Sequence, residues 1–191
     1  LIVFLILTLF VSILTAPIWY YTSIFYHDMG ASSSLISFVF GLQGMVEIPF
    51  FFIANRLINR FGLKQMLLLS FFCNGLRSLL YAIVPNPQWA LGIELLQGIS
   101  WSLLWVCCIE YVNEIVPSEW RATGQSLLWA VFLGIVAIIG NLWTGYLYEL
   151  IPIRRIFLYN SIGLFIFSIL VTIMFYKNKS NKYAEMTFIR K

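Results

Sequence analysis

Charged residues are scarce in this sequence. Asp, Glu, Lys and Arg together make up 10% of the 191 residues, whereas 61% are hydrophobic. Soluble domains carry about 25% charged residues, so a soluble fold of this length has too little polar surface to cover its apolar side chains. The net charge of +4 does not indicate a nucleic-acid partner, because the basic residues flank the hydrophobic runs. We therefore expect an integral membrane protein whose surroundings are the lipid bilayer, with no nucleic acid bound.

Histidine and aspartate occur once each, as the neighbours His27 and Asp28. An aspartyl dyad needs two acids, and a zinc site needs more ligands than one imidazole. The three cysteines, Cys73, Cys107 and Cys108, lie inside apolar runs and form no CxxC pair, so they indicate packing rather than redox or metal chemistry. We therefore predict that the protein is not an enzyme and uses neither a metal nor a cofactor.

Long hydrophobic runs, in contrast, are abundant. About 20 apolar residues in a helix cross a hydrocarbon core of about 30 Å, and six runs reach that length. They are continuous rather than alternating, which favours helices over the strands of a barrel. The predicted fold is all-α and polytopic, with a six-helix transmembrane bundle over residues 1–176 and a basic, disordered cytoplasmic tail over 177–191. The predicted helices cover about 1–26, 35–55, 66–84, 89–112, 124–148 and 156–176.

Lys and Arg are distributed unequally between the two sides of the predicted membrane. Arg154 and Arg155 flank the runs on one side, and nine basic residues lie on the other. Because cytoplasmic loops carry the excess of Lys and Arg, we expect both ends of the chain to be cytoplasmic. We expect the plasma membrane rather than an internal membrane. The nine residues are Arg56, Arg60, Lys64, Arg121, Lys177, Lys179, Lys182, Arg190 and Lys191.

Polar side chains inside the second and third runs are the first candidates for a site. A charge near the bilayer centre costs at least about 2.5 kcal/mol, so such groups pair or face a cavity. Gln43 and Glu47 lie one turn apart on one face, and Arg77 shares a face with Asn74. Our hypothesis is that Glu47 and Arg77 form a charge pair. The sequence leaves open whether this pair is a proton-linked switch or a static structural pair.

The fourth run adds a stripe at helical spacing, formed by Glu94, Gln97, Trp101 and Trp105. The tryptophans suit either stacking on a ring-shaped solute or plain packing, and Glu94 lies near the outer end, where simple hydration is the alternative. Together with the polar residues of the second and third runs, this stripe forms the predicted pathway for substrate and protons. Glu110 lies about 160° around the helix from Glu94, so we expect a structural or gate-side role for it.

The stretch Glu94–Gln125 resembles the fourth helix and following loop in the C-terminal half of major facilitator superfamily transporters. The matching pieces are E-L-L-Q-G at Glu94–Gly98, the aromatic Trp105 and P-x-x-W-R-A-T-G-Q at Pro117–Gln125, and the resemblance continues through Gly140–Glu149. The branch it resembles most is that of major facilitator superfamily domain-containing protein 6, which is similar to bacterial proton-linked nucleoside and oligosaccharide symporters.

A second motif supports the same resemblance. Residues 59–64 read N-R-F-G-L-K and are similar to the superfamily's D-R-x-G-R-K loop. Arg60, Gly62 and Lys64 match, whereas Asn59 replaces the acid and Leu63 the second base, so an ion pair built on that acid is not expected. These three residues, with Glu110 and Arg121, are therefore candidates for a gate-side or structural role.

The resemblance implies that these helices are numbers seven to twelve of a twelve-helix transporter. Their partner would be the N-terminal six-helix half of the same protein, with a cavity between the halves and alternating access to it. The implied function is transport of a small polar solute, with proton coupling as a further hypothesis. The alternative is a receptor or scaffold that keeps the transporter fold without transport.

Overall fold

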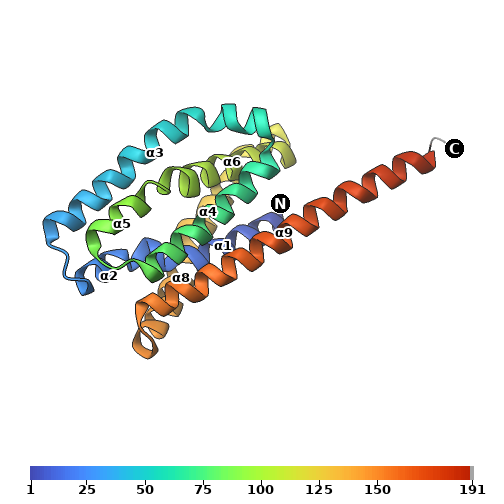
Figure 1. The fold of residues 1–191 in the computed structure, drawn as a ribbon. Helices are drawn as coiled ribbons and strands as arrows, with labels where there is room; N and C mark the ends of the chain where they lie inside the picture. The colour runs from blue at the N-terminus through green and yellow to red at the C-terminus, as the bar shows by residue number, and fades with distance from the viewer. Residues whose placement is uncertain (190–191) are drawn as a thin grey trace.

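The computed structural model describes residues 1–189, apart from the side chains of Ala90 and of residues 176–189. Every regular element in that part of the chain is a helix (Figure 1). Six helical stretches in it are long and apolar enough to cross a membrane, which confirms the predicted all-α fold with six spans. These candidate spans are Ile2–Tyr20, Ser33–Phe61, Leu63–Ile83, Pro87–Ile115, Ser118–Leu150 and Ile153–Phe175.

The first predicted helix is divided in two. Helix α1 covers Ile2–Tyr20 and the short helix α2 covers Thr22–Asp28. Pro17 lies inside α1, and its carbonyl oxygen accepts a hydrogen bond from the N–H of Tyr21, the residue between the two helices. The division places α2 against α3, at the end of the bundle where α4 ends and α5 begins, and brings the Tyr26 ring to 6.5 Å from that of Tyr81 in α4.

The second and third spans are longer than their apolar runs suggested, and a single residue separates them in the sequence. Helix α3 covers Ser33–Phe61, and α4 covers Leu63–Ile83. The Ser32 side chain caps α3 by accepting a hydrogen bond from the N–H of Leu35 at 3.2 Å. Gly62 alone separates α3 from α4, with φ of +94°. Only glycine adopts this conformation without strain, which explains the glycine of the N-R-F-G-L-K motif.

The fourth and fifth spans each contain a π-helical segment near their middle. The fourth consists of α5 (Pro87–Glu94), the π segment η1 (Gly98–Ser102) and α6 (Leu103–Ile115). The fifth consists of the 3-10 turn η2 (Ser118–Trp120), α7 (Arg121–Trp129), the π segment η3 (Ala130–Ile135) and α8 (Val136–Leu150). A π segment inserts an extra residue into a turn, and such insertions are frequent at functional sites.

The last span belongs to α9, which covers Ile153–Ile189. We expected the helix to end near Tyr176 and a disordered tail to follow over 177–191. Helix α9 is described through Ile189, and residues 190 and 191 lie outside the described residues, so the disordered cytoplasmic tail stays a prediction. The end of the last span is therefore not marked by a break in the backbone.

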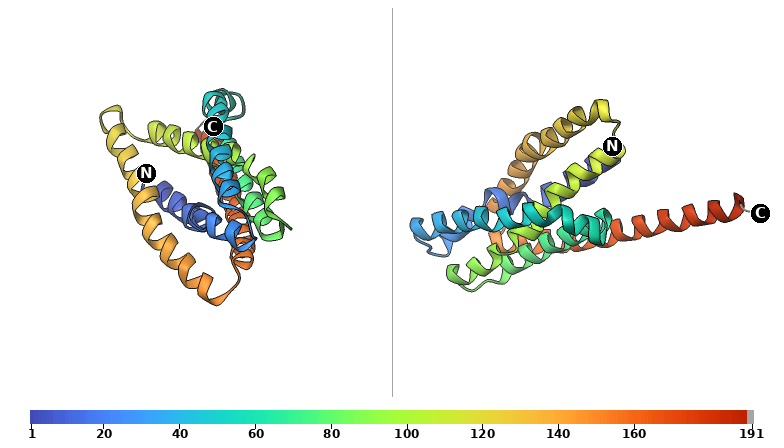
Figure 2. Two further views of the ribbon diagram at one scale, coloured as in Figure 1. Left: turned by 90° about the vertical axis from the view of Figure 1, so that its left-hand side faces the viewer. Right: turned by 90° about the horizontal axis from the view of Figure 1, so that it is seen from above.

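The helices pack around α1, α4 and α9. Helices α4 and α9 run antiparallel and in contact along their lengths, with Gly75 of α4 against Phe165 of α9. Helix α1 lies in the middle of the bundle, between α8 on one side and α9 and α4 on the other (Figure 2). At Gly140 of α8 a Cβ atom would lie 2.6 Å from the Cβ of Ala16, so α8 approaches α1 this closely only because that position is glycine.

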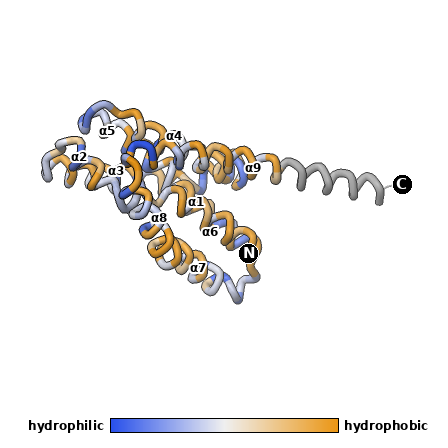
Figure 3. Tube along the Cα trace, turned by 90° about the horizontal axis from the view of Figure 1, so that it is seen from below, coloured by the Kyte–Doolittle hydropathy of each residue, from blue (hydrophilic) through white to orange (hydrophobic). Residues whose placement is uncertain are grey.

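Two hydrophobic clusters hold the bundle together. The inner cluster joins α1, α4, α6 and α9 around Phe71, Leu103 and Leu164. The outer cluster joins α2, α4 and α9 around Phe25, Tyr81 and Phe157. Hydrophobic colour extends along the helices and hydrophilic colour gathers mainly at their ends (Figure 3). The polar residues buried at mid-helix therefore stand out as exceptions that need partners.

Candidate functional site

The centre of the site is the carboxylate of Glu94, the last residue of α5. Its side chain is fully buried. Oε2 accepts hydrogen bonds from Arg77 Nη2 at 2.7 Å and from Gln43 Nε2 at 2.7 Å. Oε1 accepts a hydrogen bond from the hydroxyl of Tyr26 at 2.8 Å and another from that of Tyr81. Glu94 thus joins α2, α3 and α4 to the fourth span, and we call these five residues the Glu94 network.

Arg77 is the cation of this network and is 2% exposed. Its pair with Glu94 is the one salt bridge among the side chains that the structure describes. The guanidinium also donates from Nη1 to Gln97 Oε1 and lies 5.6 Å from the ring centroid of Tyr81, one helical turn further along α4. Within the described part of the chain its Nε has no hydrogen-bond partner. The cation is therefore held by several groups but retains one free donor.

Gln97 extends the network to a second carboxylate. Its Nε2 donates to Glu47 Oε1 at 2.6 Å, while its Oε1 accepts from Arg77. Glu47 is half-buried, in contrast to Glu94. The polar groups therefore form a continuous series from Glu94 through Arg77 and Gln97 to Glu47. One end of that series is enclosed and the other end is accessible.

This geometry corrects two expectations. The direct pair predicted between Glu47 and Arg77 is wrong, because Gln97 lies between them and Arg77 pairs with Glu94. The alternative of a hydrated Glu94 near the outer surface is also wrong, because α2 crosses that end of the bundle and Tyr26 covers the carboxylate. The sequence places Gln97 and Glu94 on one stripe, but it does not show which of the two side chains Arg77 contacts.

Asn74 lies outside the network, although it shares a face with Arg77. Its Nδ2 donates to the carbonyl oxygen of Ser70 at 2.9 Å and to that of Ser100 at 2.8 Å. The second bond crosses from α4 to η1 and satisfies a carbonyl of the π segment. Asn74 therefore fastens η1 to α4, next to the point where Gln97 joins the network.

Two tyrosines of the site were not predicted as site residues. Tyr81 lies four residues after Arg77, a spacing that places both on one helix face, so the sequence held a signal for it. Tyr26 gave none, because it reaches Glu94 only through the break at Tyr21 that turns α2 across the bundle.

A cluster of aromatic rings lies one turn along the fourth span from Gln97. The ring of Trp101 stacks on that of Trp105 with centroids 5.8 Å apart, and meets Trp19 edge-on at 4.4 Å and Phe132 edge-on at 5.8 Å. Trp105 is 7% exposed and also contacts Trp129. Beside the cluster is a cavity of about 220 Å³, lined by Ser12, Thr15, Trp19, Tyr20, Trp101, Phe132, Leu133 and Val136. Trp101 lines this cavity, whereas Trp105 lies behind it.

The candidate gate-side residues lie away from the network. Arg60 is exposed, with its guanidinium carbon 5.2 Å from the ring centroid of Phe61, and the Lys64 ammonium lies 5.1 Å from that of Phe175. Arg121 is exposed and Glu110 is half-buried. Gly62 forms the turn between α3 and α4. These residues gather at the end of the bundle opposite to Glu94. Their gate-side or structural role stays a prediction.

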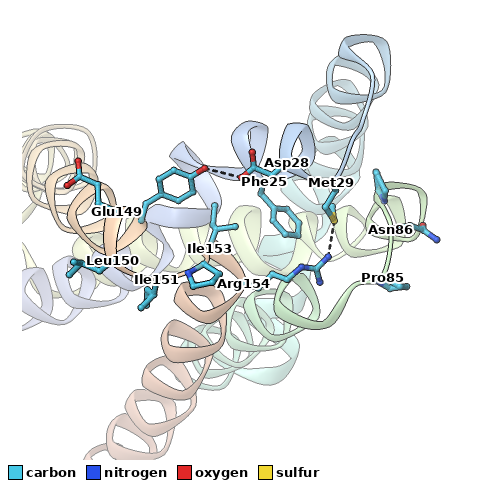
Figure 4. A pocket seen from close by; sticks show the side chains of 13 residues that line it. Phe25, Asp28, Met29, Pro85, Asn86, Glu149, Leu150, Ile151, Ile153 and Arg154 are labelled. Atoms are coloured by element: carbon cyan, nitrogen blue, oxygen red, sulfur yellow. Dashed lines mark hydrogen bonds between the residues drawn. The ribbon is translucent and has the colours of Figure 1, made fainter.

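A larger pocket of about 750 Å³ opens at the end of the bundle where α2 lies, between the turns that follow α2, α4 and α8 (Figure 4). Arg154 lies at its base and donates to the carbonyl oxygen of Val84 at 2.6 Å and to the sulfur of Met29 at 3.3 Å. Tyr148 donates to Asp28 at 3.0 Å across the same opening. These hydrogen bonds connect the three turns that surround the pocket.

Known proteins resemble this chain in both sequence and fold. The model of the MFS_1 like family matches residues 1–159. Maltose permease of Geobacillus stearothermophilus is 31% identical over 142 residues, which cover 74% of this chain and 36% of that protein. Major facilitator superfamily domain-containing protein 6-like protein A of Xenopus laevis is 24% identical over 121 residues, or 63% of this chain and 20% of that protein.

A solved structure agrees with the sequence relatives. The crystal structure of the nucleoside transporter NupG superposes on 91% of this chain and 48% of its own, with a TM-score of 0.77 and 19% identity. This likeness shows the fold, that of a major facilitator transporter. The chain spans about a third or less of the length of these curated relatives and about half of the NupG chain.

Proposed function

The chain belongs to the MFS_1-like family, and we propose on that premise that it moves a small polar solute across the membrane by alternating access. It is a multi-pass membrane protein with six candidate spans among its described residues. The observation that carries the proposal is the buried series from Glu94 to Glu47. Ionisable groups at membrane depth are costly and mark substrate and proton pathways, and this series ends on a carboxylate that is accessible.

The proposal includes a partner and an orientation. These helices are one half of a twelve-helix transporter, and the N-terminal six-helix half of the same protein closes the cavity on the side of α3, α7 and α8. Large apolar side chains on these helices are uncovered within the chain, including Met45 and Phe52 of α3 and Leu142 of α8, with exposures of 71%, 80% and 71%. Both ends of the chain are cytoplasmic, in line with the distribution of Lys and Arg, and the membrane is the plasma membrane.

Proton coupling is part of the proposal, and Glu47 is the group that carries it. Glu94 is enclosed and receives four side-chain hydrogen bonds, so no proton reaches it without rearrangement. Glu47 is half-buried and receives one such bond, from Gln97. A proton that binds Glu47 removes its charge and weakens that bond. Gln97 then reorients, and Arg77 loses one of its acceptors.

The consequence is a change in the position of Arg77. With Gln97 turned away, the guanidinium depends more on Glu94 and Tyr81, both on the outer side of the site. Protonation of Glu47 is thereby linked to the packing of α3 against η1, where the Ser102 hydroxyl also bonds the backbone oxygen of Glu47 at 3.4 Å. Such a link lets the proton bias one of two conformations of the cavity.

Transport is tested with the full-length protein in liposomes. Maltose and uridine are suitable first solutes, because the relatives described above include a maltose permease and a nucleoside transporter. We expect counterflow of at least one of these solutes above the level of protein-free liposomes. Saturable binding of a solute without counterflow would instead identify a receptor on a transporter fold and overturn the proposal.

A further inference from the structure

The aromatic cavity beside Trp101 is lined by residues of both described π-helical segments, η1 and η3. Trp101 belongs to η1 and Phe132 to η3, and their ring centroids are 5.8 Å apart. A π turn displaces side chains from the positions that a regular α-helix would give them. The two insertions therefore place an aromatic ring from the fourth span and one from the fifth on the same cavity.

The size and lining of this cavity suit a ring. A cavity of about 150 Å³ lined by apolar side chains is sufficient for benzene, and the volume here is about 220 Å³. Trp19, Trp101 and Phe132 form its aromatic walls. Flat rings gain from edge-to-face and offset contacts with such side chains in a way that aliphatic groups do not. The cavity also has an open side, since Trp19 is 38% and Leu133 62% exposed.

One wall of the cavity is polar, and it offers acceptors. Ser12 and Thr15 of α1 are both buried, with exposures of 3% and 4%. The Ser12 hydroxyl donates to the carbonyl oxygen of Thr8 at 2.7 Å, and the Thr15 hydroxyl donates to that of Ser12 at 3.1 Å. Because both hydrogens are used within the helix, each oxygen presents lone pairs to the cavity. The wall therefore suits a ligand that carries N–H or O–H donors.

We propose that this cavity is the ring-binding subsite of the transported solute, and that it selects a flat aromatic or heteroaromatic ring with a hydrogen-bond donor on its edge. The ring lies against Trp101 and Trp19, and its donor meets Ser12 and Thr15. The inference rests on the proposed transport function and narrows its substrate class. Gln97 lies one turn from Trp101, so a ring in the cavity is next to the series that ends on Glu47.

Matched ligand pairs test the subsite without knowledge of the natural solute. The probes are 4-hydroxyphenyl and 4-hydroxycyclohexyl β-glucoside, and uridine and methyl riboside. Each pair shares its polar part and differs in the flat ring. Binding is measured on the purified full-length protein by the rise in the midpoint of thermal unfolding and by quenching of tryptophan fluorescence. We expect the ring-bearing member of at least one pair to raise the midpoint and its partner to have little effect.

Variants locate the binding. Trp101→Leu should weaken binding of the ring-bearing probe about tenfold, the change that corresponds to about 1.4 kcal/mol and lies within the range for loss of one aromatic stacking partner. Thr15→Val keeps the shape of the wall and removes one acceptor, so it should weaken binding as well without disturbing the aromatic cluster. Trp89→Leu is the matched control, because Trp89 is 71% exposed and does not line the cavity.

The outcomes separate this inference from the proposed function. Equal stabilisation by both members of every pair shows that the cavity takes any apolar group, such as a lipid chain, and overturns the ring subsite. An absence of effect from all probes, or an equal loss of binding in Trp89→Leu, overturns it too. Ring-selective binding without counterflow supports the subsite and contradicts transport. Counterflow without ring preference supports transport and contradicts the subsite.

Discussion

Arg77 of α4 and Glu94 of α5 form a salt bridge of 2.7 Å in which the side chains are 2% and 0% exposed. Neither charge reaches solvent, and each has further hydrogen-bond partners, from Tyr26, Gln43, Tyr81 and Gln97. Removal of one partner of such a pair strongly destabilises the fold, because it leaves an uncompensated buried charge. The pair therefore fixes how α2 to α5 meet.

The first prediction follows from this asymmetry. Glu94→Gln should destabilise the protein by about 3–5 kcal/mol, the usual cost of removing one member of a buried pair. Arg77→Met combined with Glu94→Gln should recover more than half of that loss, because no unpaired charge remains. Thermal unfolding in detergent measures both, with Glu149→Gln as the exposed control. A double variant that is less stable than Glu94→Gln would contradict this account of the pair.

The second prediction concerns the packing of α3 on η1. A Cβ atom at Gly98 would overlap the ring of Phe50, whereas no atom lies within 4 Å of a Cβ at Gly92. Gly98→Ala should therefore cost about 1–3 kcal/mol, as other overpacking substitutions do. Gly92→Ala should be neutral or stabilise by up to about 1 kcal/mol, because alanine favours the helix. Equal unfolding midpoints for the two variants would show that α3 does not contact η1 this closely.

The third prediction distinguishes two neighbouring arginines, Arg154 and Arg155, in the first turn of α9. Arg154 donates to the carbonyl oxygens of Val84 and Ala82 and lies 5.5 Å from the ring centroid of Phe25, whereas Arg155 is exposed. Arg154→Met leaves buried acceptors without a donor, at a cost of about 1–3 kcal/mol. Arg155→Met should be close to neutral. The unfolding midpoints of both variants decide the matter, and similar losses would indicate a general effect of charge.

The fourth prediction tests the orientation in the membrane. Cys73, Cys107 and Cys108 are buried, with exposures of 6%, 0% and 0%, so these three thiols should react little with a maleimide in the folded protein. Ser33→Cys, at the outer turn, should be labelled by a membrane-impermeant maleimide in intact cells. Arg60→Cys, at the opposite end, should be labelled only after the cells are opened. The reverse pattern would show that the ends of the chain face outward.

The spans and the fold could be predicted from the sequence because they depend on the length and continuity of apolar runs. The boundaries could not, because they depend on single residues. Ser32 begins α3 before its first apolar residue, and Gly62 lets α3 and α4 continue through what looked like a polar loop. The π segments had no signal either, since they reflect packing between spans rather than a local pattern.

The sequence predicted most residues of the candidate site, but not the hydrogen bonds that connect them. The polar stripe of Glu94, Gln97 and Trp101 is present, and Gln43, Glu47 and Arg77 join it as separate helices meet. The sequence could not show that Glu94 is enclosed, because that depends on the turn of α2 that brings Tyr26 over it. Nor could it show that Asn74 faces the backbone of η1, since the partner carbonyl belongs to another span.

The central claim is that a proton on Glu47 acts on transport through Gln97 and Arg77. Its most direct test is solute uptake by the full-length protein in liposomes, measured across a series of imposed proton gradients. Wild-type uptake should rise with an inward gradient. Glu47→Gln should retain exchange of solute but lose the dependence on the gradient, and Glu149→Gln should behave as wild type. Uptake by Glu47→Gln that follows the proton gradient as steeply as wild type would contradict the claim.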